Sequence, residues 1–272
     1  MKQKMIALLA FVSVFCSVSA QKVNETVTLY GKDQLQGFTI NIDNDSLNLV
    51  DDAMANLFET QYKLKGSKKK GYHVYENQSC FVFGEARYDI YFTTAEVGKK
   101  KDKTVQVTLV VSTGNMNCIT FSNDPRTSRN IVAFLEKFPS EVQAYDIKLR
   151  IQNFENELSK LNKERDLLLK NRSKVEDKIT TTNNELTATS EKLNNVSNEL
   201  ASLQEQFNSS YDPAIKEQID QVAKEKQNLQ KSQSNLQKSL FNLNDDLVKI
   251  NAKLEKVEQD IASTENELKK LK

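Results

Sequence analysis

The chain has 272 residues and nearly balanced charge, with 38 basic and 37 acidic side chains and a net charge of +1 at pH 7. This balance argues against a polyanion-binding surface over the whole protein, so no nucleic-acid partner is expected. A single histidine and three cysteines leave few of the usual ligands for a metal site and few candidates for a histidine-dependent catalytic site. We therefore predict a noncatalytic protein without a cofactor.

The first twenty residues have the pattern of a secretory signal peptide. Lys2 and Lys4 supply positive charge, and the apolar run at residues 5–18 is too short to span a membrane. The small pair Ser19-Ala20 precedes the expected cleavage site. We expect a periplasmic or secreted protein, cleaved after Ala20, with no transmembrane segment in the mature chain.

Two cysteines remain in the mature chain, Cys80 and Cys118. Both fall in segments with a strand pattern, and an oxidising compartment would allow them to form a disulfide. The alternative is two buried thiols that pack as small apolar side chains. The sequence leaves these two interpretations open.

Composition divides the mature chain into two parts. All seven glycines lie between Gly31 and Gly114, whereas the later residues are rich in Leu, Lys, Glu, Asn and Gln. This change predicts a domain boundary, with a globular domain at residues 21–138 and a helical domain at residues 139–272.

The globular part alternates between strand and helix patterns. Strands are predicted at Glu25–Tyr30, Gly37–Ile42, Tyr72–Tyr75, Cys80–Phe83, Tyr88–Thr94, Thr104–Ser112 and Cys118–Phe121. Apolar residues that recur every three or four positions predict a helix over Ser46–Tyr62, with Asp45 or Ser46 as its cap. Asp124 and Pro125 predict the start of a second helix that continues to Phe138.

The order of these elements predicts an α+β head domain, in which an antiparallel sheet carries two helices on one face. Gly98–Lys103 is expected to form a hairpin turn between two of the strands.

The helical part contains two apolar seams with the spacing of a coiled coil, alternating steps of three and four. The first seam contains Ile151, Phe154, Leu158, Leu161, Arg165, Leu168, Arg172, Val175, Ile179, Thr182, Leu186, Thr189, Leu193, Val196, Leu200, Leu203 and Phe207. The second contains Ile215, Ile219, Val222, Lys226, Leu229, Gln233, Leu236, Leu240, Leu243, Leu247, Ile250, Leu254, Val257, Ile261, Thr264, Leu268 and Leu271.

The two seams have the same number of positions and are separated by a break at residues 208–213. Folding the chain back at Tyr211 places Phe207 opposite Ile215 and Ile151 opposite Leu271. This match predicts that a long antiparallel α-helical coiled-coil hairpin follows the head domain. The alternative is a parallel pairing of these helices with a second copy of the chain, which leucine-rich seams also permit.

Two other features are candidates for binding or chemistry. The basic runs Lys68–Lys70 and Lys99–Lys103 lie beside turn glycines, where they could contact an anionic envelope surface or simply be solvated. The single histidine, His73, lies in a strand segment, where an exposed or hydrogen-bonded structural role is the ordinary interpretation.

These patterns favour an interaction or scaffold protein that uses its helical hairpin as a spacer and contact element. The polar tip, Asn208, Ser209, Ser210, Tyr211 and Asp212, is the predicted contact site for an unidentified protein of the cell envelope. The alternative is an envelope enzyme or a ligand-binding head whose hairpin serves to form a homo-oligomer.

Overall fold

The computed structural model describes residues 22–43, 45–98 and 103–272. The chain folds into two compact units, Met1–Leu149 and Arg150–Lys272. The predicted signal peptide at residues 1–20 and most of the predicted turn at Gly98–Lys103 lie outside the described residues. The two units are described separately below.

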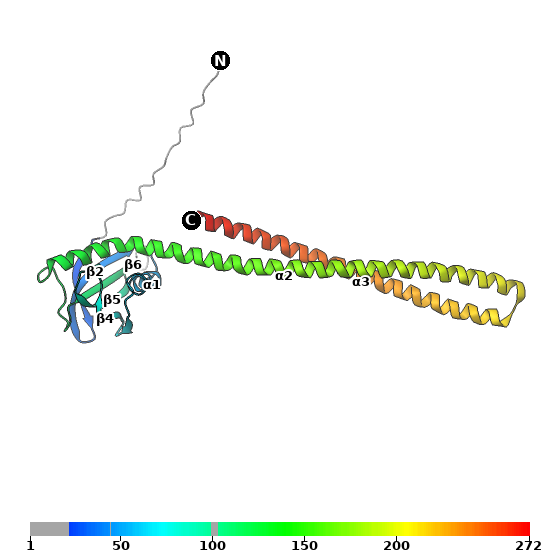
Figure 1. Ribbon diagram of the computed structural model, residues 1–272, viewed down its shortest axis with the longest axis horizontal. Coiled ribbons are helices and arrows are strands. Elements are labelled where there is room, and N and C mark those ends of the chain that lie inside the picture. Colours follow the sequence, from blue (N-terminus) through cyan, green and yellow to red (C-terminus); the bar gives the residue numbers. More distant parts are fainter. Residues whose placement is uncertain (1–21, 44, 99–102) are drawn as a thin grey trace, which may run out of the picture. The chain divides into compact units, whose positions relative to one another are not determined.

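The first unit is built on a six-stranded antiparallel sheet with the strand order β1-β2-β6-β5-β4-β3, which agrees with the sheet expected for the head domain (Figure 1). The strands are β1 (Asn24–Tyr30), β2 (Asp33–Asp43), β3 (Ser67–Lys69), β4 (Tyr72–Ser79), β5 (Arg87–Val97) and β6 (Thr104–Ser112). The sheet therefore ends in β1 on one side and in the three-residue β3 on the other.

Alternation along the strands gives the sheet two different faces. One face contributes Phe38, Ile40, Phe92, Val107 and their neighbours to the main hydrophobic core, which the helices cover. The opposite face carries a smaller buried cluster: Tyr30, Leu35, Tyr72, Val74, Tyr91, Val110 and Cys118.

Helix α1 (Leu47–Asn56) lies on the main core face and continues into a short π-helical segment at Leu57–Gln61. Its N-cap is Ser46, whose side chain accepts a hydrogen bond from the backbone N of Leu49 at 3.2 Å. Of the two caps predicted, Ser46 is thus the correct one. The buried side chains of Met54 and Phe58 fix this helix against the sheet.

Helix α2 (Pro125–Ser210) begins as predicted but is much longer than predicted. The Asp124 carboxylate caps it by accepting a hydrogen bond from the backbone N of Thr127 at 3.0 Å. The expected end at Phe138 is wrong, because the helix continues through Pro139. Phe138 and Val142 are both fully buried in the main core, so one apolar stripe runs across the proline and holds the chain in helical form.

Two predicted strands do not form. Cys80–Phe83 makes a turn, in which the backbone N of Phe83 donates to the carbonyl of Cys80 at 3.0 Å. Cys80 and Phe83 are buried and Phe81 is exposed, and this spacing of three differs from the alternation by two of a strand. The segment Cys118–Phe121 makes a single bridge, between Ser112 and Cys118, in place of a strand.

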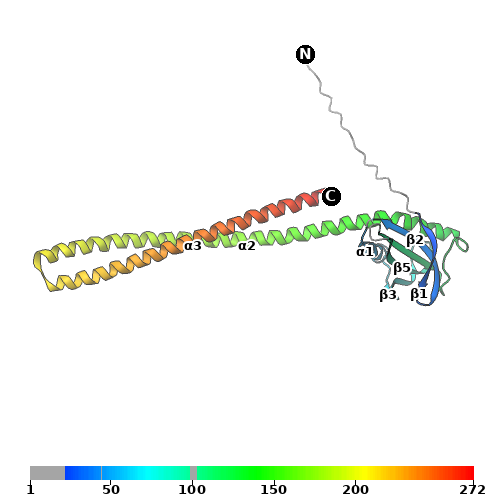
Figure 2. The ribbon, with the colours of Figure 1, turned by 180° about the vertical axis from the view of Figure 1, so that it is seen from behind.

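The second unit contains the rest of α2 and helix α3 (Pro213–Leu271), which pack together in a hairpin-like arrangement (Figures 1 and 2). Polar contacts join the helices at separate levels. Gln233 Nε2 donates to Ser190 Oγ at 3.1 Å, and Lys272 Nζ lies 3.2 Å from Glu155 Oε1. These contacts bring α2 close to α3 at Gln233 and close to the last residue of the chain at Lys272.

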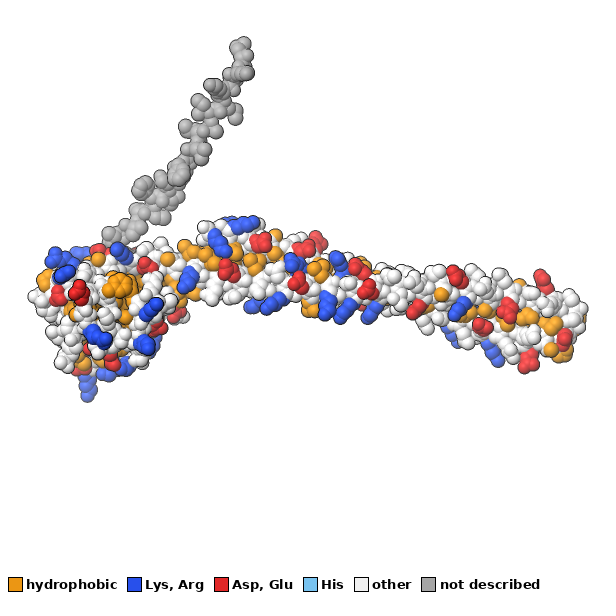
Figure 3. Space-filling view, in the orientation of Figure 1, with side chains coloured by type: hydrophobic (Ala, Val, Ile, Leu, Met, Phe, Trp, Pro, Cys, Tyr) orange, Lys and Arg blue, Asp and Glu red, His pale blue; other side chains and the backbone are white. Residues whose placement is uncertain are grey.

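Burial in the second unit follows the predicted seams. Every position of both seams is at least partly shielded from solvent, whereas most other positions of the two helices are exposed. The most buried residues of this unit are Thr182, Val196, Val222, Leu254, Val257 and Thr264. Charged side chains of both signs lie along the outer surface (Figure 3). No helix within the described residues combines the length and apolar character needed to cross a membrane.

Candidate functional site

The predicted contact site lies where α2 ends and α3 begins. Tyr211 has a positive φ of 54°, and its backbone N donates to the carbonyl of Phe207 at 2.7 Å. Asp212 then caps α3, because its Oδ1 accepts a hydrogen bond from the backbone N of Ala214 at 2.9 Å. Pro213 is the first residue of the helix, where its missing N–H has no cost.

The tip presents one large aromatic side chain among small polar ones. Tyr211 is 75% exposed, and its ring contacts that of Phe207 in an edge arrangement with centroids 5.9 Å apart. The hydroxyls of Ser209 and Ser210 donate to carbonyls one turn earlier in α2. Asn208 is exposed beside them. The side chain of Tyr211 thus contacts the Phe207 ring on one side and is otherwise largely exposed to solvent.

The two cysteines are free thiols, and both are buried. Cys80 belongs to the main core beneath the helices, whereas Cys118 belongs to the small cluster on the opposite face of the sheet. Burial raises the pKa of Cys80 to about 11 and also raises the pKa of Cys118. Both side chains therefore remain protonated and unreactive at neutral pH.

The single histidine takes part in a polar cluster centred on Asp51 of α1. His73 Nε2 lies 2.9 Å from Asp51 Oδ2, Thr94 Oγ1 donates to Asp51 Oδ1 at 2.7 Å, and Lys68 Nζ lies 3.4 Å from Oδ2. The imidazole stacks on the Phe92 ring, with centroids 4.4 Å apart.

This cluster connects α1 to three strands of the sheet, and its members change the pKa of Asp51. Burial raises the pKa of Asp51, but hydrogen bonds from Thr94 and His73 and the nearby charges of His73 and Lys68 outweigh burial and lower it. Among the hydrogen bonds that the structure describes, none joins His73 to a serine or cysteine nucleophile. The arrangement fits a structural role for His73.

The lysines of the first basic run are engaged within the protein. Lys68 pairs with Asp51, Lys69 Nζ lies 2.9 Å from Glu76 Oε1, and Lys70 Nζ lies over the Tyr30 ring at 4.4 Å from its centroid. Each lysine of this run thus has a contact within the protein, and the side chains of Lys68 and Lys69 remain 62% and 46% exposed. Of the second run, only Lys103 is described, and it pairs with Glu96.

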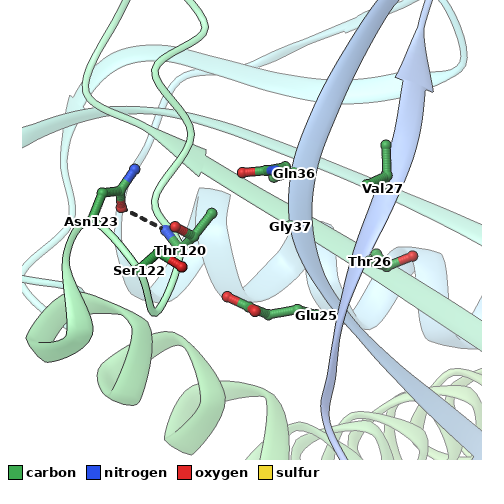
Figure 4. Close-up of a pocket in the computed structure, with 8 residues that line it drawn as sticks. All are labelled: Glu25, Thr26, Val27, Gln36, Gly37, Thr120, Ser122 and Asn123. Carbon is green, nitrogen blue, oxygen red and sulfur yellow. Dashed lines mark hydrogen bonds between the residues drawn. The ribbon is translucent and has the colours of Figure 1, made fainter.

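A cavity of about 570 Å³ opens beside β1, a feature that the sequence did not indicate (Figure 4). It is lined by Glu25, Thr26, Val27, Gln36, Gly37, Thr120, Ser122 and Asn123. The loop that follows β6 forms its second wall. This loop is fixed because Asn123 Oδ1 accepts from the backbone N of Thr120 at 2.9 Å and Asn123 Nδ2 donates to the carbonyl of Cys118 at 2.8 Å.

Glu25 is the charged residue of this cavity. Figure 4 shows its side chain pointing from β1 toward the loop. Its Oε1 accepts a hydrogen bond from the backbone N of Phe121 at 2.8 Å, which leaves the second carboxylate oxygen for another donor. The residues of this site come from β1, β2 and the loop after β6 and have no common motif, so only the fold brings the loop to the two strands.

Comparison with known proteins found no matching family model, no similar curated protein and no similar solved structure. Within the part of the chain that the structure describes, no group of three or more His, Cys, Asp or Glu side chains could hold a metal ion. The tip at residues 208–212 and the β1 cavity are the two candidate sites of this protein.

Proposed function

We propose that the protein is a noncatalytic, periplasmic or secreted interaction protein. In this proposal α2 and α3 form an intramolecular antiparallel coiled-coil hairpin that acts as a spacer. Its tip, residues 208–212, contacts a protein partner of the cell envelope. The observation that carries the proposal is the exposure of Tyr211, a large aromatic side chain, at the end of a long shielded seam.

The seam supports the role of a spacer. Shielding at steps of three and four over both helices is the pattern of coiled-coil packing. The 59 residues of α3 correspond to a rise of about 88 Å at 1.5 Å per residue. The hydrogen bond from Gln233 to Ser190 supports an antiparallel register, because it joins residues 43 positions apart at a matching level of the two seams.

The tip supports the role of a contact site. Tyrosine is enriched among the residues that dominate binding energy at protein interfaces. The contact with the Phe207 ring and the fixed turn restrict Tyr211 before a partner binds, so less conformational entropy is lost on binding.

Site-specific photocrosslinking tests the contact site. A photoreactive phenylalanine analogue at position 211 should trap a protein partner in intact cell envelopes. The matched control is Phe241 on α3, which is 74% exposed against 75% for Tyr211 and belongs to the same helical unit. Equal trapping at both positions, or trapping at position 241 alone, would contradict the role of the tip.

Spin labels test the hairpin. Lys192 and Lys231 are exposed residues on either side of the Ser190 and Gln233 contact, so cysteines introduced there report on the pairing. Helices packed about 10 Å apart give a short distance between the labels in a dilute monomer, whereas one extended helix would separate these positions by about 58 Å. Singly labelled variants control for labelling of the buried native thiols.

Mass and N-terminal sequence test the remaining parts of the proposal. A monomeric mass over a wide concentration range is expected from light scattering, and a concentration-dependent dimer that shows only intermolecular spin-label distances would favour the parallel alternative. The mature protein recovered from the envelope or medium should begin at Gln21. An intact N-terminus at Met1 would contradict secretion through a cleaved signal.

A further inference from the structure

The two edges of the sheet are protected to very different degrees. The edge strand β3 has three residues, two of them lysines, which is a usual way of preventing another strand from pairing. The other edge strand, β1, has seven residues and pairs only with β2 in the described sheet. Its sequence, NETVTLY, contains one charge and no proline. Alternate backbone groups of β1 therefore face away from β2 without a strand partner.

The exposed side chains of β1 form an apolar stripe at this edge. Val27 is 60% exposed and Leu29 is 62% exposed. Residues two apart in a strand point to the same face, so these two side chains are neighbours. Glu25 is the next residue on that face, and it reaches into the cavity beside β1.

The cavity has the properties of a site for a polar side chain. Small-molecule pockets of similar volume are lined mostly by apolar and aromatic residues, whereas this one is lined by Glu25, hydroxyls, amides and a single valine. No ion pair joins Glu25 to a lysine or arginine within the described residues. The carboxylate is thus the complement of a basic group that would come from outside.

We propose that β1 is a docking site for an extended segment of another protein, which adds to the sheet as a seventh strand. Apolar residues of that segment lie against Val27 and Leu29, and a lysine or arginine places its cation beside Glu25. Main-chain hydrogen bonds to the free edge supply affinity, and the alternate side chains supply selectivity. The site is independent of the hairpin tip.

The charge of Glu25 favours a basic segment over a second copy of β1. An antiparallel pair of two β1 strands centred on Val27 would place Glu25 opposite Leu29 of the other copy. Because β1 contains no lysine or arginine, self-pairing supplies no cation for either carboxylate. Each copy would bring an exposed carboxylate to the interface without a cation, so self-pairing lacks the charge complementarity that a basic segment supplies.

A short peptide tests the site with the full mature chain. The probe is acetyl-Val-Thr-Val-Thr-Lys-amide, which places valines opposite Leu29 and Val27 and its lysine opposite Glu25 when it runs antiparallel to β1. The matched control has glutamate in place of lysine. We expect the lysine peptide to bind about tenfold more tightly, because the control replaces an attraction by a repulsion.

Two variants of Glu25 distinguish an effect of its charge on peptide binding from an effect on the stability of the fold. Glu25→Gln keeps an acceptor for the backbone N of Phe121, so it should leave urea unfolding unchanged while weakening the lysine peptide about fivefold. Glu25→Lys should reverse the preference, so that the glutamate peptide becomes the tighter ligand. Equal preference in the wild type and in Glu25→Lys would overturn the proposal.

Hydrogen exchange shows where the peptide binds. Saturating lysine peptide should slow amide exchange within residues 24–30 and leave residues 67–69 unchanged, since β3 is the protected edge. No slowing at residues 24–30 would overturn the proposal. So would a mature protein that sediments as a dimer through β1 and is not dissociated by the peptide, because a second copy would then occupy the edge.

Discussion

Replacing Asp51 by alanine should destabilise the head unit by about 3 kcal/mol at pH 7. The variant loses the hydrogen bond from Thr94 at 2.7 Å and the contact with His73 at 2.9 Å, each worth about 1.5 kcal/mol for a charged acceptor. The contact with Lys68, whose side chain is 62% exposed, adds little. Asp51→Asn keeps one acceptor and the shape of the side chain, and should lose about half as much.

The loss should also depend on pH in a defined direction. The pKa of Asp51 is lowered in the folded protein, so its contribution to stability is present above the unfolded value near 3.8 and is lost as the pH falls through the folded value. The difference in unfolding free energy between wild type and Asp51→Ala should therefore narrow as the pH falls below about pH 4.

Urea unfolding followed by near-ultraviolet circular dichroism measures this difference in the head unit. The chain has no tryptophan and eight tyrosines, and every tyrosine except Tyr211 lies between Tyr30 and Tyr145. The signal near 280 nm thus reports on the first unit, whereas the signal at 222 nm is dominated by the long helices. A difference below about 0.5 kcal/mol at pH 7, or one that stays constant down to pH 3, would refute the reasoning.

Three further predictions concern the seam, the turn and the core. Leu254→Ala, at a seam position that is 5% exposed, should lower the stability of the 222 nm transition by about 3 kcal/mol, whereas Leu167→Ala, at a position 59% exposed, should change it by less than about 0.5 kcal/mol. Equal effects would contradict the seam. Asp212→Ala removes the cap of α3 and should cost about 1 kcal/mol in the same transition, while an unchanged midpoint would show that the cap is unimportant. Cys80, whose pKa is raised to about 11 by burial, should not react with a thiol reagent at pH 8 until urea unfolds the head, and fast reaction of the native protein compared with Cys80→Ser would contradict its burial.

The sequence predicted the sheet and the positions of shielding in the helices because both follow from hydrophobic periodicity. The strand at Thr104–Ser112 has the predicted bounds, and every predicted seam position is shielded. The predicted helix caps are also confirmed, since Ser46, Asp124 and Asp212 all accept hydrogen bonds at the beginning of a helix.

Two errors in the predicted strands have physical reasons, one in the short length of a segment and one in tertiary pairing. Cys80 and Phe83 lie in a turn that buries both side chains. The pattern of a segment of four residues is too short to distinguish such a turn from a strand. Strand β3 was missed because Ser67, Lys68 and Lys69 have no strand preference of their own and form a strand by pairing with β4.

The β1 cavity could not have been predicted from the sequence. Glu25 and Gln36 come from adjacent strands, and Thr120 and Asn123 come from a loop almost a hundred residues later. Their juxtaposition depends on the register of β1 on β2 and on the path of the chain after β6. Neither can be read from residue spacing.

Because α2 continues through Pro139, the position at which this protein can be truncated lies after the proline. A head fragment that stops at Phe138 would lack Val142, which is fully buried in the main core, and would leave a hole in that core. Expression of the head alone should therefore extend to Leu149, where the first unit ends. For the same reason, exchanging the helical part for a different rod should be attempted after this residue, because a graft at the proline would damage the sheet domain that it was meant to preserve.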